Sequence, residues 1–256
     1  MKAHRRQEKI LKDLARQGRV SVIELAATHK VTVETIRRDL TALDQAGALR
    51  KIRGGAVVAP ALATPETGVT QREITHAEAK ARIASAALAA LDLRPGATLL
   101  IDSGTTTGAF ARFLPDDLDL LVLTNSVLIA ATLAPRPGCQ VRIIGGHVRG
   151  LTQAAVGPEA LLQLASLRAD YAILGSNGLT AQHGLSTPDP DEAAVKRAMV
   201  SAGRRVAALI DASKIGQEHL ISFADTDNVD LLVTDAVITG SLATHLHDSG
   251  CEVIPA

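Results

Sequence analysis

The residues best suited to bind a small anion form a polar loop after an apolar run in the second half of the chain. Residues 97–102 end in Asp102, and glycine and small hydroxyl residues follow. Backbone N–H groups at a helix start, together with small hydroxyl groups, form an anion cradle. No Lys follows the loop, so it is not a Walker-type nucleotide loop. An ordinary turn with a capping Thr fits the pattern equally well. The residues of this loop are Asp102, Ser103, Gly104, Thr105 and Thr106.

Similar polar groups follow the other apolar runs of this region. The carboxyl ends of parallel strands lie on one side of a sheet, and ligands bind there. In such a crevice Asp accepts sugar hydroxyls, backbone N–H groups bind phosphate, and Lys supplies positive charge. We therefore predict a site for a small polyhydroxylated anion. Its further residues are Thr124, Asn125, Ser126, Gly145, Gly146, Gly175, Asp211 and Lys214.

The elements that must position these loops are strands that alternate with helices. Runs that are apolar on both faces are typical of a parallel sheet covered by helices on both sides. The fold class predicted for this part is therefore α/β, preceded by a long Ala-rich helix over 72–91. The predicted strands cover residues 97–102, 118–123, 140–144, 170–174, 205–210 and 230–234.

A second kind of chemistry lies at the other end of the chain, which is basic although the formal net charge of the whole chain is zero. Residues 1–56 hold 13 Lys and Arg against 6 Asp and Glu, whereas residues 57–256 hold 14 against 21. A basic head on an acidic body can bind nucleic acid even when the total charge is neutral. The asymmetry also favours two domains.

The basic head has the pattern of a winged helix-turn-helix. Helices are predicted over 4–17, 22–28 and 32–45, with Ser21 and Thr32 as N-caps and Gly18 and Gly47 as stops. A short strand over 48–52, a turn at Gly54-Gly55 and residues 56–58 complete the wing. Turn-rich residues 59–71 form the predicted linker.

The third predicted helix has one apolar and one polar face. Ile36, Leu40 and Leu43 share a face at spacings of four and three, so they must point into the core. The second helix of such a motif enters the major groove, where Arg contacts guanine or phosphate. A solvated surface or a protein-contact face would look the same. The candidate DNA-contacting residues are Glu34, Thr35, Arg37, Arg38, Thr41 and Gln45 on the helix and Arg50, Lys51 and Arg53 on the wing.

These segments resemble the DNA-binding domain of the DeoR family of bacterial transcriptional regulators. The most specific run is Thr35-Ile36-Arg37-Arg38-Asp39-Leu40, and Arg53-Gly54-Gly55-Ala56 also matches. The resemblance adds Arg6 and Thr32 to the predicted DNA-binding residues. His is more usual than Arg at position 53, and Ser more usual than Thr at position 32.

The second half resembles the effector domain of the same family. The matching positions include Asp102–Thr106, the Thr124-Asn125-Ser126 run and the segment from Glu192 to Met199. The resemblance adds Glu192 and Lys196 to the site, and it implies a fold similar to ribose-5-phosphate isomerase and a phosphorylated sugar as ligand. The implied protein is a repressor with domains at 1–58 and 72–256. It would bind operator DNA as a homo-oligomer, a dimer or a tetramer, and the ligand would relieve repression.

An enzyme remains the alternative from another functional class. Asp102, Asp191, Glu192 and Lys196 could supply acid and base for an aldose–ketose proton shuttle in a sugar-phosphate isomerase or deaminase. Among the histidines only His147 and His183 lie in candidate loops, and ligand binding explains the motif residues without catalysis. We therefore expect no catalytic site.

Composition argues against several other classes. Aromatic residues make up 2% of the chain, too few for single-strand binding by base stacking. Cys139 and Cys251 have no metal or redox spacing, and the eight His are dispersed. No run approaches the roughly 20 apolar residues that span a bilayer, and no signal peptide is evident. We expect a cytoplasmic protein without cofactor, metal or membrane contact.

Overall fold

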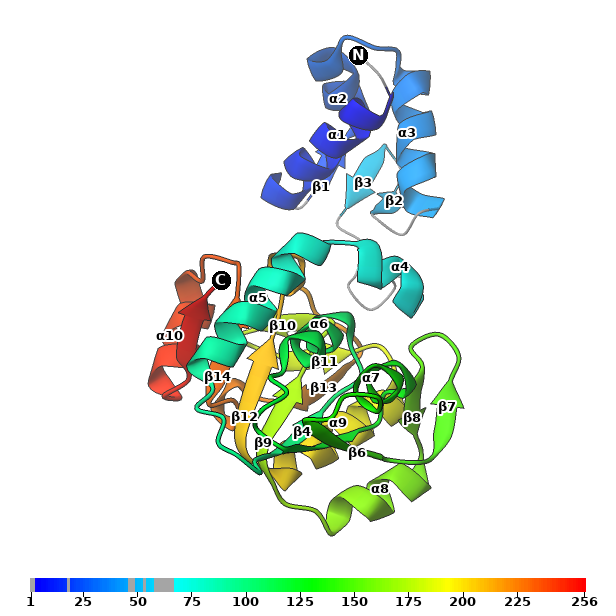
Figure 1. Ribbon diagram of the computed structural model, residues 1–256. Coiled ribbons are helices and arrows are strands. Elements are labelled where there is room, and N and C mark those ends of the chain that lie inside the picture. The colour runs from blue at the N-terminus through cyan, green and yellow to red at the C-terminus, as the bar shows by residue number, and fades with distance from the viewer. Residues whose placement is uncertain (1–2, 18, 46–48, 53, 58–66) are drawn as a thin grey trace. The chain divides into compact units, whose positions relative to one another are not determined.

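The structure is a computed structural model that describes residues 3–17, 19–45, 49–52, 54–57 and 67–256. The chain divides into two compact units, residues 1–66 and 67–256 (Figure 1). The predicted linker extends to residue 71, but residues 67–71 belong to the second unit. Val69 is buried, and its N–H donates to Leu151 O at 2.9 Å, which ties this stretch to the effector region. Residues 59–66 of the predicted linker lie outside the described residues.

The described part of the first unit contains the predicted helices and wing. The wing strands lie in the order β1-β3-β2, all antiparallel. β1 was not predicted, because three residues are too few to show an alternating pattern. Gly47, the predicted stop of the third helix, lies outside the described residues, as does Gly18. The elements are α1 (Ala3–Gln17), β1 (Arg19–Ser21), α2 (Val22–His29), α3 (Val33–Gln45), β2 (Arg50–Ile52) and β3 (Gly55–Val57).

The core of the first unit decides which face of α3 stays exposed. Ile36 and Leu40 are fully buried and Leu43 nearly so, as their spacing predicts. They pack in one cluster with Ile10 and Leu14 of α1. The wing joins this core through a close backbone approach, because a Cβ at Gly55 would lie 2.0 Å from Val20 O. The opposite face of α3 is therefore free of the core.

A seven-stranded parallel sheet forms the centre of the second unit (Figure 1). The strand order is β15-β14-β12-β9-β4-β5-β6. Six of these strands match the six predicted runs to within two residues at each end, so the α/β prediction is confirmed. The seventh, β15, was not predicted. The strands are β4 (Thr98–Ile101), β5 (Leu120–Thr124), β6 (Cys139–Ile143), β9 (Ala169–Leu174), β12 (Gly203–Leu209), β14 (Leu231–Thr234) and β15 (Glu252–Pro255).

Helices cover both faces of this sheet because its strands are apolar on both sides. Leu99 and Ile101 face a cluster with α5, α6 and α7, whereas Leu100 faces a second cluster with α8, α9 and α10. The alternation of neighbouring residues between two cores is what a strand buried on both faces requires. The helices are α5 (Ala77–Ala90), α6 (Thr105–Phe113), α7 (Val127–Leu133), α8 (Pro158–Ala165), α9 (Pro190–Ala202) and α10 (Gly240–Asp248).

Two small antiparallel sheets lie outside the central sheet, and neither was predicted. A hairpin of β7 and β8 follows β6, and β11 pairs with both β10 and β13. Their strands have three or four residues, too short for a periodic signal. They are β7 (His147–Arg149), β8 (Ala154–Val156), β10 (Gly178–Thr180), β11 (Gly184–Thr187) and β13 (Ile221–Ala224). Short 3-10 helices lie at Ala212–Lys214 and Thr226–Asn228.

One local prediction for the helices of the second unit is wrong. The single helix predicted over 72–91 is two helices, α4 (Val69–Ile74) and α5, with a break where His76 adopts a left-handed backbone (φ 56°). Pro190 occupies the first turn of α9. Proline is compatible with that position because the first N–H groups of a helix have no partner within the helix.

Both cysteines belong to the hydrophobic clusters of the second unit. Cys139 and Cys251 are buried and form no disulfide. Burial raises the pKa of the Cys251 thiol to about 11, so it stays protonated at neutral pH. In the described ranges, no helix is long and apolar enough to cross a membrane, and no three His, Cys, Asp or Glu side chains gather as a metal site.

Candidate functional site

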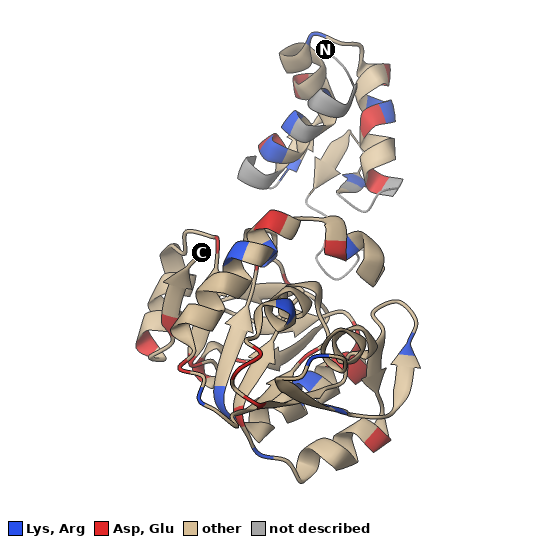
Figure 2. Ribbon diagram, in the orientation of Figure 1, with Lys and Arg blue, Asp and Glu red and all other residues tan. Residues whose placement is uncertain are grey.

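The exposed face of α3 carries most of the residues predicted to contact DNA. Glu34 and Arg37 have side chains 71% and 61% exposed and lie 3.7 Å apart, and Arg38 is also exposed. Both basic and acidic positions lie along the ribbon of this helix (Figure 2). Thr32 begins the helix: its Oγ1 accepts a hydrogen bond from Thr35 N at 3.2 Å. The cap prediction for Thr32 is therefore confirmed, and the polar face stands clear of the core.

The wing adds Lys51 to this face. Lys51 Nζ donates to Thr41 Oγ1 at 2.8 Å, and Lys51 N donates to Asp44 Oδ1 at 3.0 Å. These bonds connect β2 with the exposed side of α3. The side chains of Arg50 and Gln45 and the whole of Arg53 lie outside the described residues.

Arg6 is buried between two helices, so its predicted place on the DNA-contacting face is wrong. Its Nε donates to Asp39 Oδ2 at 2.5 Å and its Nη2 donates to Asp39 Oδ1 at 3.2 Å. Both side chains are less than a tenth exposed. Because Arg6 belongs to α1 and Asp39 to α3, this ion pair joins the two helices. The Arg6 guanidinium therefore holds α3 in place from the buried side of this helix, and it is not exposed to bind a phosphate.

We expect Arg38→Ala to weaken binding of an operator duplex by about 1–3 kcal/mol if Arg38 contacts a base edge. The fold should be unaffected because the side chain is exposed. Fluorescence anisotropy with operator and scrambled duplexes at several salt concentrations measures the effect. Equal losses on both duplexes with a shallower salt slope would assign Arg38 to phosphate instead. Arg19→Ala, exposed on β1, is the matched control; a larger loss there would contradict the prediction.

The second candidate site lies where the strand order of the sheet reverses. β4, β5 and β6 run outward on one side, and β9, β12 and β14 on the other, so the switch point falls between β4 and β9. Ligands of open α/β sheets bind at this point, beyond the carboxyl ends of the strands. Asp102 follows β4 and Gly175 follows β9, and Gly175 N donates to Asp102 Oδ2 at 3.1 Å.

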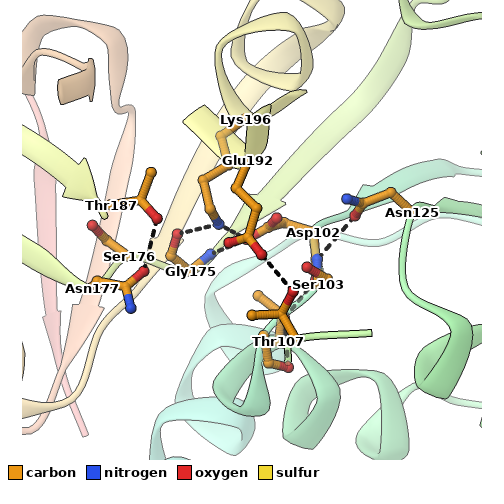
Figure 3. A network of polar contacts seen from close by, with 12 residues as sticks. Asp102, Ser103, Thr107, Asn125, Gly175, Ser176, Asn177, Thr187, Glu192 and Lys196 are labelled. Atoms are coloured by element: carbon orange, nitrogen blue, oxygen red, sulfur yellow. Dashed lines mark hydrogen bonds and ion pairs between the residues drawn. The ribbon is translucent and has the colours of Figure 1, made fainter. Parts of the chain in front are cut away.

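A buried ion pair forms the floor of this site (Figure 3). Lys196 Nζ, from α9, donates to Asp102 Oδ2 and, at 3.1 Å, to Gly175 O. The side chains are 4% and 1% exposed, and the ammonium lies 5.3 Å from the centroid of the Phe223 ring. Burial raises the pKa of Asp102, and the charge of Lys196 opposes that shift. The pair thus fixes α9 against the loop that follows β4.

A cavity of about 380 Å³ opens above this pair. Nine of the predicted effector-binding residues line it: Ser103, Gly104, Thr105, Thr106, Gly175, Glu192, Lys196, Asp211 and Lys214. The N-cap of α6 is Gly104, which has no side chain to cap the helix, and the first residues of the helix line the cavity. The first N–H groups of a helix have no partner within the helix and can bind an anion. Asp102 itself lies beneath the cavity wall. The other lining residues are Thr67, Gln71, Arg72, Thr75, His76, Lys80, Ser176, Asn177, Leu209 and Ser213.

The remaining predicted residues support the wall or lie elsewhere. Asn125 Oδ1 accepts a hydrogen bond from Ser103 N at 3.0 Å, and Ser126 caps α7. Thr124 Oγ1 accepts from Ser126 N. Gly145 and Gly146 do not line the cavity. Gly146 is explained by packing, because a Cβ there would lie 2.4 Å from Val156 O.

The sequence predictions missed two cations of the cavity, Lys80 and Arg72. They belong to α4 and α5, which precede the sheet, whereas the predicted site residues were sought in the segments that follow strands. Lys80 Nζ donates to Thr75 O at 2.8 Å and to Arg72 O, the last carbonyls of α4. Burial lowers the pKa of Lys80, and the charges of Lys214 and Arg72 act in the same direction. Arg72 Nε is buried and makes no hydrogen bond to the described residues. An Ala-rich helix gave no signal that its one Lys would point toward the strand ends.

Arg149 and Thr152 were also missed. Arg149 Nη1 and Thr152 Oγ1 both donate to Glu192 Oε1, the latter at 2.5 Å. Arg149 Nε lies 3.2 Å from Asp189 Oδ2. These residues belong to the short β7–β8 hairpin, which carries no recognisable motif.

The residues proposed for the enzymatic alternative converge only in part, because Glu192 and Lys196 line the cavity and Asp102 lies beneath it. Asp102 is bound by Lys196, and Asp191 is exposed and outside the cavity lining. His147 is exposed, and His183 Nε2 lies 2.9 Å from His219 O, away from the lining residues. No specific observation therefore favours an acid–base pair here.

Comparison with known families identifies both parts of the chain. The family model described as "DeoR-like helix-turn-helix domain" matches residues 6–60, and "DeoR C terminal sensor domain" matches residues 75–236. The chain belongs to the DeoR family. It is thus a DeoR family transcriptional regulator in which α3 lies in the helix-turn-helix domain and the cavity lies in the sensor domain.

Relatives within the DeoR family span nearly the whole chain. The HTH-type transcriptional regulator GlpR of Haloferax volcanii is 34% identical over 86% of this chain and 85% of its own length. The glycerol-3-phosphate regulon repressor of Escherichia coli K12 is 32% identical over 92% of both. Ribose 5-phosphate isomerase A of Methanocaldococcus jannaschii matches 56% of each chain with 14% identity and a TM-score of 0.41, which is too low to support a conclusion.

Proposed function

We propose that this DeoR family regulator is a repressor whose operator binding is controlled by a phosphorylated sugar bound in the cavity above Asp102 and Lys196. Two half-sites on DNA require at least two reading heads, so the active form is proposed to be a homo-oligomer. The relatives are named as regulators and repressors, one of them of a glycerol-3-phosphate regulon, which supports this class of function.

The observation that carries the proposal is the distribution of lysine. Residues 57–256 are acidic overall and contain three Lys, and all three line this one cavity: Lys80, Lys196 and Lys214. Arg72 adds a guanidinium with a buried, unbonded Nε. Lys196 is already paired with Asp102, so Lys80, Lys214 and Arg72 are the cations left for a ligand. Bringing these like charges together costs free energy unless an anion neutralises them, and a phosphate group does so.

The rest of the cavity suits a polyhydroxylated body. Asp211 is buried and its Oδ1 accepts a hydrogen bond from Ser213 N at 3.1 Å, so the carboxylate is held in a set orientation. Ser103, Ser176 and Asn177 add hydroxyl and amide groups. Carboxylates and amides of this kind bind sugar hydroxyls, whereas the cations bind phosphate.

A direct experiment titrates the full-length protein with ribose 5-phosphate, fructose 6-phosphate and glycerol 3-phosphate, each beside its unphosphorylated counterpart. Isothermal calorimetry reports binding, and an operator fragment from its own promoter region reports the response. We expect binding of a phosphorylated compound only, with a change in operator affinity. Sequence-independent DNA binding without response to any of these compounds would contradict the proposal.

Lys214→Ala should lower the affinity for the effector at least tenfold, because a charge-assisted hydrogen bond contributes about 1.5–3 kcal/mol. Operator affinity without effector should stay unchanged, since Lys214 is partly exposed in the cavity wall and far from α3 in the chain. Calorimetry and anisotropy measure the two quantities. Arg168→Ala, exposed after α8, should change neither; a folded Lys214→Ala protein that no longer binds operator would refute the division of labour.

A further inference from the structure

The β7–β8 hairpin is bonded to α9, to the segment that follows β5 and to α4. It was absent from the sequence predictions, and the proposed function gives it no role. Its strands are short, so its position depends on side-chain and backbone bonds to neighbouring elements. Three separate sets of such bonds leave residues 147–156.

The first set reaches the cavity through Glu192. This side chain is 5% exposed, lines the cavity, and accepts hydrogen bonds from Arg149 and Thr152 on one oxygen. Thr152 is itself buried. Arg149 also pairs with Asp189, the N-cap of α9. The hairpin is thus attached to the end of α9 that faces the ligand space.

The second set reaches the anion cradle through Asn125. Asn125 Nδ2 donates to Ala155 O at 3.1 Å, and Ala155 N donates to Asn125 O at 2.7 Å. The same amide accepts from Ser103 N, the first residue after Asp102 (Figure 3). Asn125 therefore connects β8 with the loop that opens α6.

The third set reaches α4, the first described element after residue 66. Leu151, in the hairpin turn, accepts a hydrogen bond from Val69 N at 2.9 Å. The far end of α4 is held by Lys80, another cavity residue. A second cavity of about 260 Å³, lined by Val69 and Glu73 of α4 together with residues of α6 and α7, leaves space on the other side of this helix.

We propose that Arg149 and Thr152 are positioning residues that connect the effector cavity to α4. A ligand hydroxyl beside Glu192 donates to its carboxylate and so competes with Arg149 and Thr152, which donate to the same oxygen. The hairpin turn then shifts, and with it the carbonyl of Leu151 that holds the start of α4. Since α4 continues into the chain that leads to the helix-turn-helix domain, this contact carries the signal toward DNA. A contiguous network of such bonds is one physical means by which two sites are coupled. The role as a signal relay rests on the proposed function, whereas the mechanical link does not.

The link is tested without any ligand by hydrogen exchange on the full-length protein. Arg149→Met and Thr152→Val remove the bonds to Glu192, and we expect amides of residues 67–75 to exchange about tenfold faster, together with those of the hairpin. The Thr152→Ser variant keeps the hydroxyl group, so its residues 67–75 should exchange as slowly as those of the wild type. Arg168→Met is the matched control and should leave residues 67–75 unchanged.

Two results would overturn the link. Faster exchange confined to residues 147–156 would show that α4 is held independently. An equal rise in the central strand β9 would show a general loss of stability without a specific path.

A second measurement separates the relay from the proposed function. Ribose 5-phosphate, fructose 6-phosphate and glycerol 3-phosphate are titrated against wild type and Thr152→Val, and operator affinity is followed. If the relay is right, a compound that changes wild-type operator affinity still binds Thr152→Val but changes its operator affinity less than half as much. A full response in Thr152→Val refutes the relay. If no compound binds wild type, the proposed function fails and the relay fails with it, while the exchange result still decides the mechanical link.

Discussion

Replacing Lys196 by Met is expected to lower the free energy of unfolding of the second unit by about 3–5 kcal/mol at neutral pH, because it leaves the Asp102 carboxylate buried without its partner. Asp102 is 1% exposed and Lys196 supplies its charge-assisted hydrogen bond. Gly175 N is its other donor, too little to replace an ammonium. Urea denaturation followed by circular dichroism measures the loss.

The loss should depend on pH with a definite sign. Burial raises the pKa of Asp102 and Lys196 opposes the shift, so the Lys196→Met protein has a still higher pKa at Asp102. A carboxyl whose folded pKa lies above its unfolded value binds a proton preferentially in the folded state, and stability falls as pH rises through the folded pKa. The loss of unfolding free energy in the Lys196→Met protein should therefore be smaller at about pH 5 than at about pH 8.

A double variant provides the control. Lys196→Met with Asp102→Asn removes the buried charge, so part of the stability should return and the additional pH dependence should disappear. A pH-independent deficit in Lys196→Met alone would contradict the explanation. The same geometry makes Asp102 a poor choice for testing ligand recognition, since its substitution disturbs the fold beneath the cavity.

Replacing Asp39 by Ala is expected to destabilise the helix-turn-helix unit by about 3–5 kcal/mol, because the Arg6 guanidinium is then buried unpaired. Domains of this size have marginal stability, so much of the population should be unfolded and operator binding should be lost. The Asp39→Ala substitution would thus abolish DNA binding, although the Asp39 side chain is buried and does not belong to the exposed face of α3. Circular dichroism melts and anisotropy with the operator fragment measure both effects.

Replacing both charged residues by apolar ones distinguishes a structural role of the Arg6–Asp39 pair from direct contact with DNA. Arg6→Met with Asp39→Leu removes both charges and should recover most of the stability, and operator binding should return with it. Arg38→Ala should instead melt as wild type does while binding operator more weakly. If Asp39→Ala melted normally and still lost binding, Arg6 or Asp39 would have to contact DNA, and the buried pair would not be the reason.

Local patterns in the sequence predicted much of this molecule. Ile36, Leu40 and Leu43 were assigned to the core from spacing alone, and all are buried. Six parallel strands were found from apolar runs, because burial on both faces leaves a continuous apolar signal. The loop after β4 was placed at the carboxyl edge of the sheet for the same reason, and it lines the cavity.

Contacts between distant segments could not be predicted in the same way. Lys80 stands on an Ala-rich helix, and nothing nearby in sequence shows that it meets Lys214 and Lys196 in one cavity. The β7–β8 hairpin is too short for a periodic signal, yet it holds Glu192. Arg6 was assigned to DNA from the family resemblance, because a residue's place in a motif does not reveal its burial.

The sequence by itself determined the two-part organisation, the exposed polar face of α3 and the parallel strands, since these follow from periodicities of a few residues. Only the tertiary structure decided which charges pair. Arg6 pairs with Asp39, 33 residues away in the sequence, and Lys196 pairs with Asp102, 94 residues away. The physical reason is that two charges pair when the packing of helices brings their side chains together and removes them from water. The separation of two residues along the chain does not show how far apart they lie in the folded protein.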